Sequence, residues 1–279
     1  MASRGPDDHG MLIDGGVGLV HRRLSILDLS DAGRCPIANE DGTVHAVHNG
    51  EIYNFADLRS ELIEAGHRFR SNCDSEVVVH GYEQWGSGLF SRLDGMFALA
   101  VWDAPRRRML LGRDRIGEKP LYLLRRPGLV AFASSLNALR EIVDSDLQVE
   151  MSAIECFLSH SFIPHPHTVW KDVESLPPAH FAVIEGDSQT HIERYWNFPS
   201  GLPERISLRE AEDSIEEGLE RSVRARLQAD VPVGGFLSGG VDSSLIMAVA
   251  ARHSPSIDTF SVGFEEEEFS ELPYARKVA

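Results

Sequence analysis

The feature that most constrains the fold is a glycine- and serine-rich turn placed between an apolar strand and a helix. The turn reads Phe236-Leu237-Ser238-Gly239-Gly240-Val241-Asp242-Ser243-Ser244. Residues 231–237 are predicted to form a short buried strand, residues 243–251 a helix and residues 259–264 a second strand. Together they form a βαβ unit, which predicts parallel strands with a ligand at their carboxyl ends.

The turn has the chemistry of an anion-binding site. The first N–H groups of a helix have no partner within it, and the helix dipole places partial positive charge there. Gly239 and Gly240 allow close approach of the backbone, and the hydroxyls of Ser238, Ser243 and Ser244 can donate hydrogen bonds. No lysine follows the glycines, which excludes the G-x-x-x-x-G-K-[ST] loop, and G-x-G-x-x-G is also absent. The turn resembles the pyrophosphate loop of the ATP pyrophosphatases. A plain serine- and glycine-rich turn is the weaker interpretation.

Length and charge exclude several classes of protein. A chain of 279 residues predicts two domains, or one domain and part of another. Lys and Arg number 27 against 43 Asp and Glu, a net charge of −16, which argues against nucleic acid and anionic membranes as partners. No apolar run approaches the ~20 residues of a membrane span. Cys35, Cys73 and Cys156 are far apart, which predicts neither a zinc site nor a disulfide framework and fits the cytoplasm.

The spacing of apolar residues in the rest of the chain predicts that its first domain is built on sheets. Residues 3–10 are predicted to be a polar loop, and residues 43–48 a strand that turns at the hairpin signal Asn49-Gly50. Asn54 is predicted to cap a helix, and Asp74 or Ser75 a second one. An antiparallel meander follows, then a short helix, a further strand and, from the capping box at Ser207, a long amphipathic helix. The predicted helices are 55–65, 75–85, 151–158 and 272–279, and the predicted strands are 95–102, 107–112, 120–124, 129–134 and 179–184.

Several motifs together resemble the glutamine-hydrolysing asparagine synthetase family: Arg4-Gly5-Pro6-Asp7, Arg23-Leu24-Ser25-Ile26-Leu27-Asp28, Asn49-Gly50-Glu51-Ile52-Tyr53-Asn54 and Gly112-Arg113-Asp114-Arg115-Ile116-Gly117-Glu118-Lys119-Pro120-Leu121-Tyr122. The resemblance implies an α+β Ntn-hydrolase-like αββα sandwich, followed by the start of an α/β Rossmann-like ATP-pyrophosphatase domain. It divides the chain into a type 2 glutamine amidotransferase domain (1–198), a linker (199–206) and part of a synthetase domain (207–279). The implied reaction is ATP-dependent asparagine synthesis from aspartate and glutamine through β-aspartyl-AMP.

The resemblance also implies site residues. Glutamine is expected to be held by Arg23, whose guanidinium would pair with the α-carboxylate, and by Leu24, Ser25, Ile26, Leu27, Glu51 and Asp74. Asn49 and Gly50 match an oxyanion hole. ATP and Mg²⁺ are expected at Leu237, Ser238, Gly239, Gly240, Asp242, Ser243, Ser244 and Val262. The expected partners are these small molecules and a second copy of the chain as a homodimer, and no resident metal site is predicted.

Each of these residues also has a plainer interpretation. Asn49-Gly50 can be only a turn, Asp74 and Asp242 only helix caps, and Arg23 only a surface charge. His165-Pro166-His167 is interpreted as a solvated proline-rich loop, because no third ligand has metal-site spacing. The acidic run at residues 265–268 is interpreted as a solvated loop, although its carboxylates could also reach a Mg²⁺ bound with ATP.

The sequence departs from the family at the position of the catalytic nucleophile. The family places a cysteine directly after the initiator methionine, where its own α-amine acts as general base, and this chain has Ala2. From this departure and the short stretch before Arg4 we expect the nucleophile and the strand that bears it to be missing, which predicts a partial copy that is inactive in glutamine hydrolysis. The missing strand would leave a sheet edge unpaired, which predicts poor solubility. Two alternatives stay open: a related amidotransferase that acts on another carboxylate, in a tailoring, polysaccharide or β-lactam pathway, and a non-catalytic remnant that binds glutamine.

Overall fold

The chain consists of two compact units, Met1–Pro199 and Ser200–Ala279. The computed structural model describes residues 1–143, 147–186, 189–201 and 205–279. The predicted linker therefore falls partly on residues 202–204, which lie outside the described residues. Each unit has a hydrophobic core of its own.

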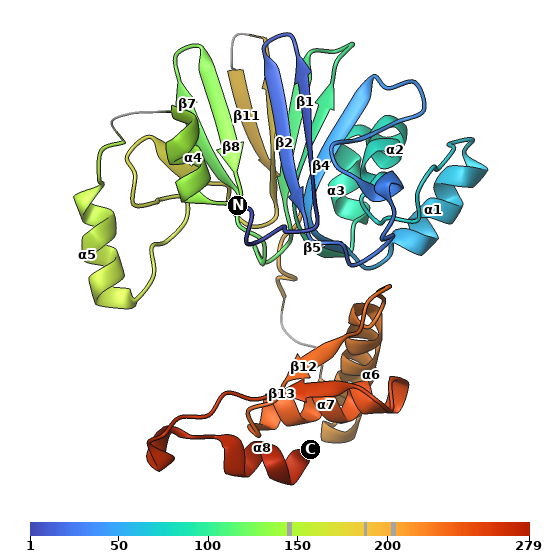
Figure 1. Cartoon of the computed structure of the whole chain (residues 1–279), viewed down its shortest axis with the longest axis vertical. Coiled ribbons are helices and arrows are strands. Elements are labelled where there is room, and N and C mark those ends of the chain that lie inside the picture. Colours follow the sequence, from blue (N-terminus) through green and yellow to red (C-terminus); the bar gives the residue numbers. More distant parts are fainter. Residues whose placement is uncertain (144–146, 187–188, 202–204) are drawn as a thin grey trace. The chain divides into compact units, whose positions relative to one another are not determined.

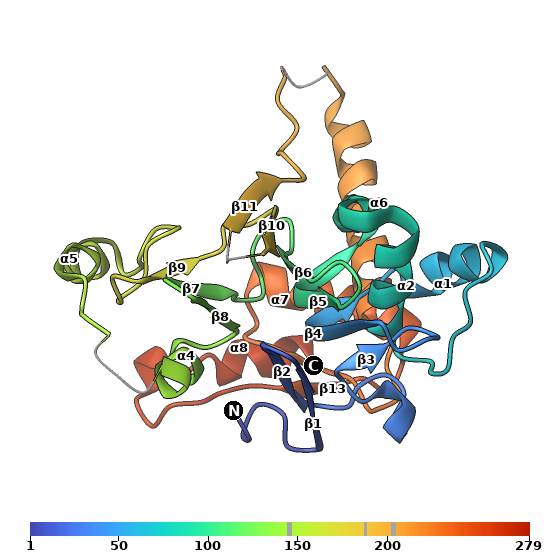
Figure 2. The same cartoon turned by 90° about the horizontal axis from the view of Figure 1, so that it is seen from above.

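The first unit (Figure 1) is built on an antiparallel sheet of six strands in the order β11-β10-β6-β5-β4-β3, all of which are labelled in Figure 2. Its central strands are apolar and buried, as expected for a sheet that is covered on both faces. The six strands are β3 (Ile37–Ala38), β4 (Val44–Ile52), β5 (Gly95–Asp103), β6 (Arg108–Arg113), β10 (His180–Glu185) and β11 (Gln189–Arg194).

Helices cover one face of this sheet, as Figure 2 shows. Ala46 and Ile52, at even-numbered positions of β4, belong to the core beneath these helices together with Val77 and Phe90. Alternate residues of a strand point to opposite faces, so the odd-numbered positions of β4 face the other way. The covering helices are α1 (Phe55–Glu64), α2 (Glu76–Trp85) and α3 (Leu89–Arg92), with the short turns η1 (Asp31–Gly33) and η2 (Gly86–Gly88).

A second strand layer covers the opposite face. It consists of the hairpin β1 (Asp8–Asp14)–β2 (Val17–Arg23) and of the sheet β8 (Leu129–Ala133)–β7 (Tyr122–Arg126)–β9 (Val173–Ser175). Leu19 and Leu123 of this layer share a core with Val47 and Trp102 of the main sheet. Helix α4 (Leu136–Val143) buries Leu139 against β7 and β8, and α5 (Met151–His160) follows it along the chain. The unit is therefore an αββα sandwich of the Ntn-hydrolase type, as predicted (Figure 2).

Three local predictions for the first unit are wrong. Residues 3–10 are not a continuous loop, because β1 begins at Asp8. Asn49-Gly50 is not a hairpin turn, because β4 continues through it to Ile52 while it pairs with β5. The predicted meander is divided between two sheets, because β6 pairs with β5 and β10, whereas β7 pairs with β8 and β9.

The helix starts are placed correctly, but their predicted caps are not formed. Asn54 precedes α1, yet its amide donates to the carbonyl of Arg92 (2.9 Å) and its carbonyl accepts from the N–H of Asp94 (2.9 Å). Ser75 makes no side-chain cap at α2, and a carboxylate oxygen of Asp74 accepts from the N–H of Ile52 (2.8 Å). Tertiary contacts have replaced local ones at both positions.

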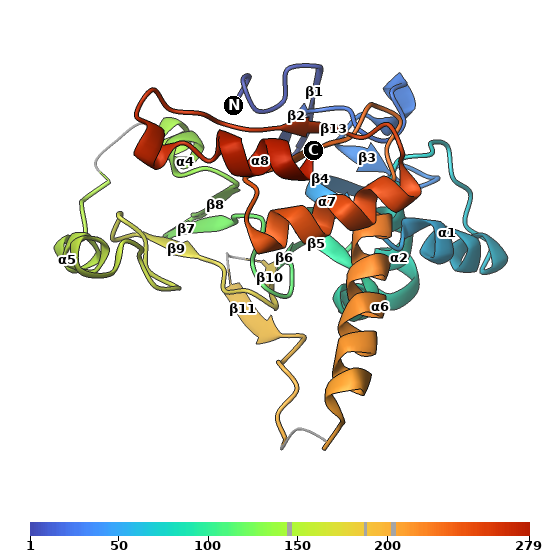
Figure 3. The same cartoon turned by 90° about the horizontal axis from the view of Figure 1, so that it is seen from below.

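The second unit contains the predicted βαβ arrangement (Figure 3). Strands β12 (Gly234–Phe236) and β13 (Asp258–Phe260) are parallel and are connected by α7 (Val241–His253). The capping box of Ser207 and Glu210 opens α6 (Leu208–Arg226), which packs on α7, and η3 (Glu267–Phe269) and α8 (Leu272–Val278) end the chain. The strand before the glycine turn was predicted to be buried, and this prediction is wrong. Phe236 is 84% exposed, because only one face of this two-stranded sheet is covered by the unit's core.

No helix in the described part of the chain is both long and apolar enough to cross a membrane.

Candidate glutamine and nucleotide sites

Strand β4 presents the side chains of Asn49 and Glu51 on the face that looks toward the second strand layer. Val47, two residues earlier on the same face, belongs to the core between the two layers. The Nδ2 atom of Asn49 is buried and has no hydrogen-bond partner among the described residues. A buried amide donor without a partner is unusual in a folded protein and is available to an acceptor on a ligand.

The backbone at Gly50 supplies a second donor on the same strand. Gly50 lies opposite Phe97 of β5, but the N–H and C=O of Phe97 are engaged with Asp114. The pair is therefore of the non-hydrogen-bonded kind, and the N–H of Gly50 points to the other edge of β4. At that edge the next strand, β3, pairs only with His45 and Ala46. Gly50 has φ +148°, and a Cβ here would lie 1.8 Å from the carbonyl oxygen of Met96, so only glycine fits.

Two carboxylates stand beside these donors. Burial and, to a smaller extent, the nearby charge of Asp74 together raise the pKa of Glu51 to about 8, against the opposing effect of Lys119. Asp74 is 4% exposed and lies at the start of α2. A ligand ammonium between these carboxylates would restore the charge of Glu51. Lys119 was not predicted as a site residue, because no pattern in the sequence around it indicates that it lies near Glu51.

Arg23 is buried, and its guanidinium already holds the loop that follows it. It donates to the carbonyl oxygens of Ser30 (2.9 Å), Leu27 (3.0 Å) and Asp28 (2.5 Å). Asp7 accepts from the N–H of Ser25 (2.8 Å), which ties the Arg4-Gly5-Pro6-Asp7 motif to the same loop. Leu24 is 57% exposed, and Ser25, Ile26 and Leu27 are half-buried. Arg23 thus stabilises this loop and is also a candidate for binding glutamine.

Two cysteines lie near the candidate glutamine site. Burial, together with the nearby charge of Asp74, raises the pKa of Cys35 to about 11 and that of Cys73 to about 12. Both thiols are protonated at neutral pH, whereas a cysteine nucleophile reacts as its thiolate. The third cysteine, Cys156, lies on α5. Neither Cys35 nor Cys73 therefore has the thiolate character of a cysteine nucleophile.

The motif of residues 112–122 organises the fold next to this site. A carboxylate oxygen of Asp114 accepts from the N–H groups of Gly117 (2.6 Å) and Glu118 (2.9 Å), and the other accepts from that of Lys119 (3.0 Å). Arg113 donates to the carbonyls of Lys119, Gly117 and Leu176. These bonds fix the turn that carries Lys119.

In the second unit, the glycine turn forms a compact network at the start of α7. The hydroxyls of Ser238 and Ser243 lie 2.9 Å apart, and the N–H of Gly240 donates to that of Ser238 (3.3 Å). Gly239 has φ +83°, and a Cβ there would lie 2.5 Å from the backbone of α8. The turn follows β12 directly, so it lies at the carboxyl end of a parallel strand, as predicted.

The other predicted nucleotide-binding residues differ in how exposed they are. The hydroxyl of Ser244 is buried without a partner among the described residues, while Asp242 and Val262 are exposed. Leu237 is buried, and its carbonyl accepts from the hydroxyl of Ser261 next to Val262 (2.6 Å). Hydroxyls and N–H groups at the start of a helix suit a phosphate group, and a carboxylate such as that of Asp242 suits Mg²⁺.

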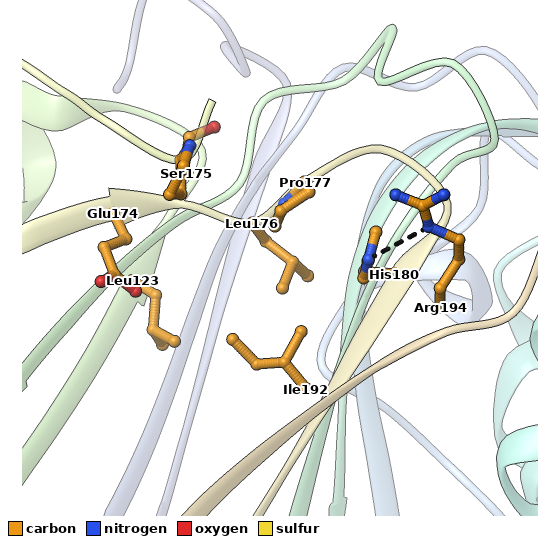
Figure 4. A pocket seen from close by; sticks show the side chains of 9 residues that line it. Leu123, Glu174, Ser175, Leu176, Pro177, His180, Ile192 and Arg194 are labelled. Atoms are coloured by element: carbon orange, nitrogen blue, oxygen red, sulfur yellow. Dashed lines mark hydrogen bonds between the residues drawn. The ribbon is translucent and has the colours of Figure 1, made fainter. Parts of the chain in front are cut away.

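A pocket of about 270 Å³ lies elsewhere in the first unit (Figure 4). Its apolar wall is formed by Leu123, Leu176 and Ile192, and at its rim Arg194 donates to Nε2 of His180 (3.4 Å). None of the predicted site residues lines it. We assign it no role in the reaction.

Two stretches of the chain match the models of known protein families. Residues 1–196 match the family model described as glutamine amidotransferase domain, and residues 214–279 match the model described as asparagine synthase. Asparagine synthetase [glutamine-hydrolyzing] 1 of Bacillus subtilis (strain 168) is 38% identical over 279 residues, 99% of this chain and 43% of that protein. Asparagine synthetase [glutamine-hydrolyzing] 3 of the same organism is 33% identical, over 96% of this chain and 44% of that protein.

The chain thus spans less than half the length of these two relatives. Among solved structures, the glutamine phosphoribosylpyrophosphate amidotransferase from B. subtilis aligns with a TM-score of 0.46 at 15% identity, over 89% of this chain and 52% of that chain.

Proposed function

The chain belongs to the glutamine amidotransferase family, with an asparagine synthase segment following, and we propose that it serves ATP-dependent asparagine synthesis from aspartate and glutamine. In this proposal the first unit binds glutamine and the second binds the pyrophosphate portion of ATP. The observation that carries it is the buried amide nitrogen of Asn49, which has no hydrogen-bond partner among the described residues and is followed on β4 by Gly50. Two donors that converge from one strand are what a developing oxyanion requires.

The first unit's residues take distinct roles. Asn49 and Gly50 donate to the oxygen of the glutamine side-chain amide as it becomes an oxyanion. Glu51 and Asp74 receive the α-ammonium, and Arg23 offers the N–H groups left over from its loop to the α-carboxylate. These roles bind and polarise glutamine; none of them breaks its amide bond.

The second unit serves the activation of aspartate. An oxygen of the aspartate side chain attacks the α-phosphorus of ATP, and pyrophosphate leaves as β-aspartyl-AMP forms. Ammonia then attacks the activated carbonyl, and AMP departs as asparagine forms. The N–H groups of Gly239 and Gly240 and the hydroxyls of Ser238, Ser243 and Ser244 hold the pyrophosphate. Asp242 and these hydroxyls would hold Mg²⁺, which neutralises charge on the leaving group.

We infer that the 279-residue chain binds glutamine without hydrolysing it, because the thiols of Cys35 and Cys73 are buried and protonated. Titration calorimetry with glutamine is expected to show binding that Asn49→Ala weakens by about tenfold, while a coupled assay detects no ammonia. Ammonia release by the purified chain would overturn the inference about hydrolysis. Absence of glutamine binding would overturn the assignment of the site.

The nucleotide site is tested separately with ATP and Mg²⁺. Ser243→Ala removes the hydroxyl that contacts Ser238 and is expected to weaken binding by roughly tenfold. Ser222→Ala is the matched control, because that hydroxyl lies on α6 and accepts from Arg226. Equal affinities of the two variants would contradict the assignment of the turn.

A further inference from the structure

Two histidines and two glutamates converge beside α1 and α2, outside both candidate sites. Glu40 follows β3, His67 follows α1, and His80 and Glu83 lie on α2, one turn apart. One ligand atom from each side chain lies within 4.8 Å of all the others. The sequence shows no such cluster, because its members come from three separate segments.

The spacing of these atoms is close to that of ligands around one metal ion. Nδ1 of His67 lies 3.5 Å from Oε1 of Glu40 and 3.8 Å from Oε2 of Glu83, and Nδ1 of His80 lies 3.4 Å from Oε2 of Glu40 and 3.6 Å from Oε2 of Glu83. Ligands about 2.0–2.1 Å from one zinc ion are separated by roughly 3.4 Å in tetrahedral geometry. Each imidazole nitrogen is thus flanked by two carboxylates at distances that one shared ion would bridge.

His80 supplies independent support for a ligand at this point. Its side chain is 1% exposed, and neither ring nitrogen has a hydrogen-bond partner among the described residues. Nδ1 faces the cluster, while Nε2 faces Glu76 at 3.5 Å. Metal-binding histidines commonly direct their second nitrogen at a carboxylate in this way.

The surrounding groups orient the two carboxylates. Glu83 accepts from Nδ2 of Asn39 (2.7 Å), and Glu40 accepts from the N–H of Arg68 (2.7 Å). Glu76 is itself held by the N–H groups of Arg70 and Ser71, both at 2.7 Å. Glu83 and Glu40 therefore each have their Oε1 atom held by a hydrogen bond, and Glu76 has both oxygens held. Such outer contacts are typical of built metal sites.

We propose that Glu40, His67, His80 and Glu83 form a binding site for a divalent transition-metal ion of the zinc type. Two neutral imidazoles and two carboxylates balance the charge of such an ion, and imidazole favours Zn²⁺ over Mg²⁺ or Ca²⁺. Glu83 is exposed, so the ion can reach the site from solvent. All four positions are filled by protein atoms, which makes the role structural: the ion joins α1, α2 and the end of β3.

The test measures Zn²⁺ binding to the full chain after treatment with a chelator. The unmodified chain is expected to bind about one Zn²⁺ in calorimetry, to give the intense visible absorption of four-coordinate Co²⁺ and to show a higher Tm with Zn²⁺. His80→Gln is expected to abolish the Co²⁺ absorption. Glu83→Gln, at a more exposed position, keeps an oxygen for Asn39 and is expected to weaken Zn²⁺ binding by roughly tenfold or more.

His191→Gln is the control, because His191 lies on β11, exposed, with Glu193 at 3.9 Å. It is expected to bind Zn²⁺ as tightly as the unmodified chain. The proposal is overturned if the unmodified chain binds no Zn²⁺, or if Glu83→Gln and His80→Gln leave its affinity unchanged. If His80→Gln prevents folding, the Zn²⁺ affinity of Glu83→Gln alone decides the test.

Discussion

Two asparagines of the first unit differ in what their amides contact. Asn39 is 1% exposed, its Nδ2 donates to Glu83, and its carbonyl accepts from the N–H groups of Thr43 (2.9 Å) and Val44 (3.0 Å). The Nδ2 of Asn49 is buried and has no such partner among the described residues. A buried donor without a partner costs stability, which supports the proposed role of Asn49 in binding.

Asn49→Leu is therefore expected to leave the free energy of unfolding unchanged or to raise it by about 1 kcal/mol, because the replacement removes an unpaired polar group. Asn39→Leu is expected to lower it by roughly 2–3 kcal/mol, since it breaks bonds that are satisfied. Urea unfolding in chelator-containing buffer compares the two variants. A loss for Asn49→Leu as large as that for Asn39→Leu would show that Asn49 is structural.

Glu51 gives the first unit a pH dependence of known sign. Its pKa is about 8 in the folded protein against 4.5 for the exposed side chain, so the folded state binds more protons between these values. Stability from this group is fully present below pH 4.5 and declines as the pH rises toward 8. Glu51→Gln is expected to be more stable relative to the unmodified chain at pH 8 than at pH 5, measured by urea unfolding. A constant difference across this range would contradict the raised pKa.

At the scale of elements, β4 carries the candidate glutamine site because it stays a strand where its sequence favours a turn. Asn49-Gly50 is a strong hairpin signal, yet pairing with β5 extends from Val44 to Ile52. The main sheet buries both faces of this strand, and that tertiary gain outweighs the local preference of two residues. Gly50 then fits because the carbonyl of Met96 leaves no room for a side chain.

Gly50→Ala is expected to lower the free energy of unfolding by about 3 kcal/mol or more, because its Cβ would collide with β5 as well as strain the backbone. Gly66→Ala is the matched control. Gly66 also has a positive φ, +102°, but nothing lies within 4 Å of a Cβ there, so only the backbone cost of about 1 kcal/mol is expected. Similar losses of unfolding free energy in the two variants would contradict the explanation that a Cβ at position 50 collides with β5.

Elements with strong local signals were predicted from the sequence, and contacts distant in sequence were not. The capping box at Ser207 correctly gives the start of α6, because its bonds lie within one turn. Asn54 and Asp74 have the same local potential as caps but use it on residues far along the chain. Strand pairing is equally non-local: no local pattern shows that β6 and β7 enter different sheets.

The candidate sites divide in the same way. The turn at Ser238–Ser244 is contiguous, so its place between a parallel strand and a helix was predictable. The glutamine residues were listed only through resemblance to a family, and their assignment stays a prediction. The cluster around His80 was missed, because its four ligands become neighbours only when α1, α2 and the end of β3 pack together.

At the scale of the whole chain, the two units differ in how much apolar surface they bury. The second unit's buried core consists of Val223, Leu237, Met247, Val249, Ala250 and Ala275. Large side chains such as Val241 (82% exposed) and Leu208 (76% exposed) remain in contact with solvent. A small core supplies little net stability once chain entropy is counted.

Unfolding in urea is therefore expected to show two transitions, with the second unit melting first. All four tryptophans, Trp85, Trp102, Trp170 and Trp196, lie in the first unit, so their fluorescence reports that unit alone. Far-UV circular dichroism also records α6 and α7 and is expected to begin its change at a lower urea concentration. Coincident transitions would mean that the two units unfold cooperatively.

Helix α2 connects the two proposals for the first unit. Asp74 and Ser75 stand at its beginning, and His80 and Glu83 lie one to two turns further along it. An ion bound by His80 and Glu83 would hold α2 in place, and the start of α2 carries Asp74, which is proposed to contact glutamine. Traces of zinc carried through purification, or stripped away by a chelating buffer, would then change the apparent substrate affinity of otherwise identical preparations, and two laboratories could disagree without either having made an error.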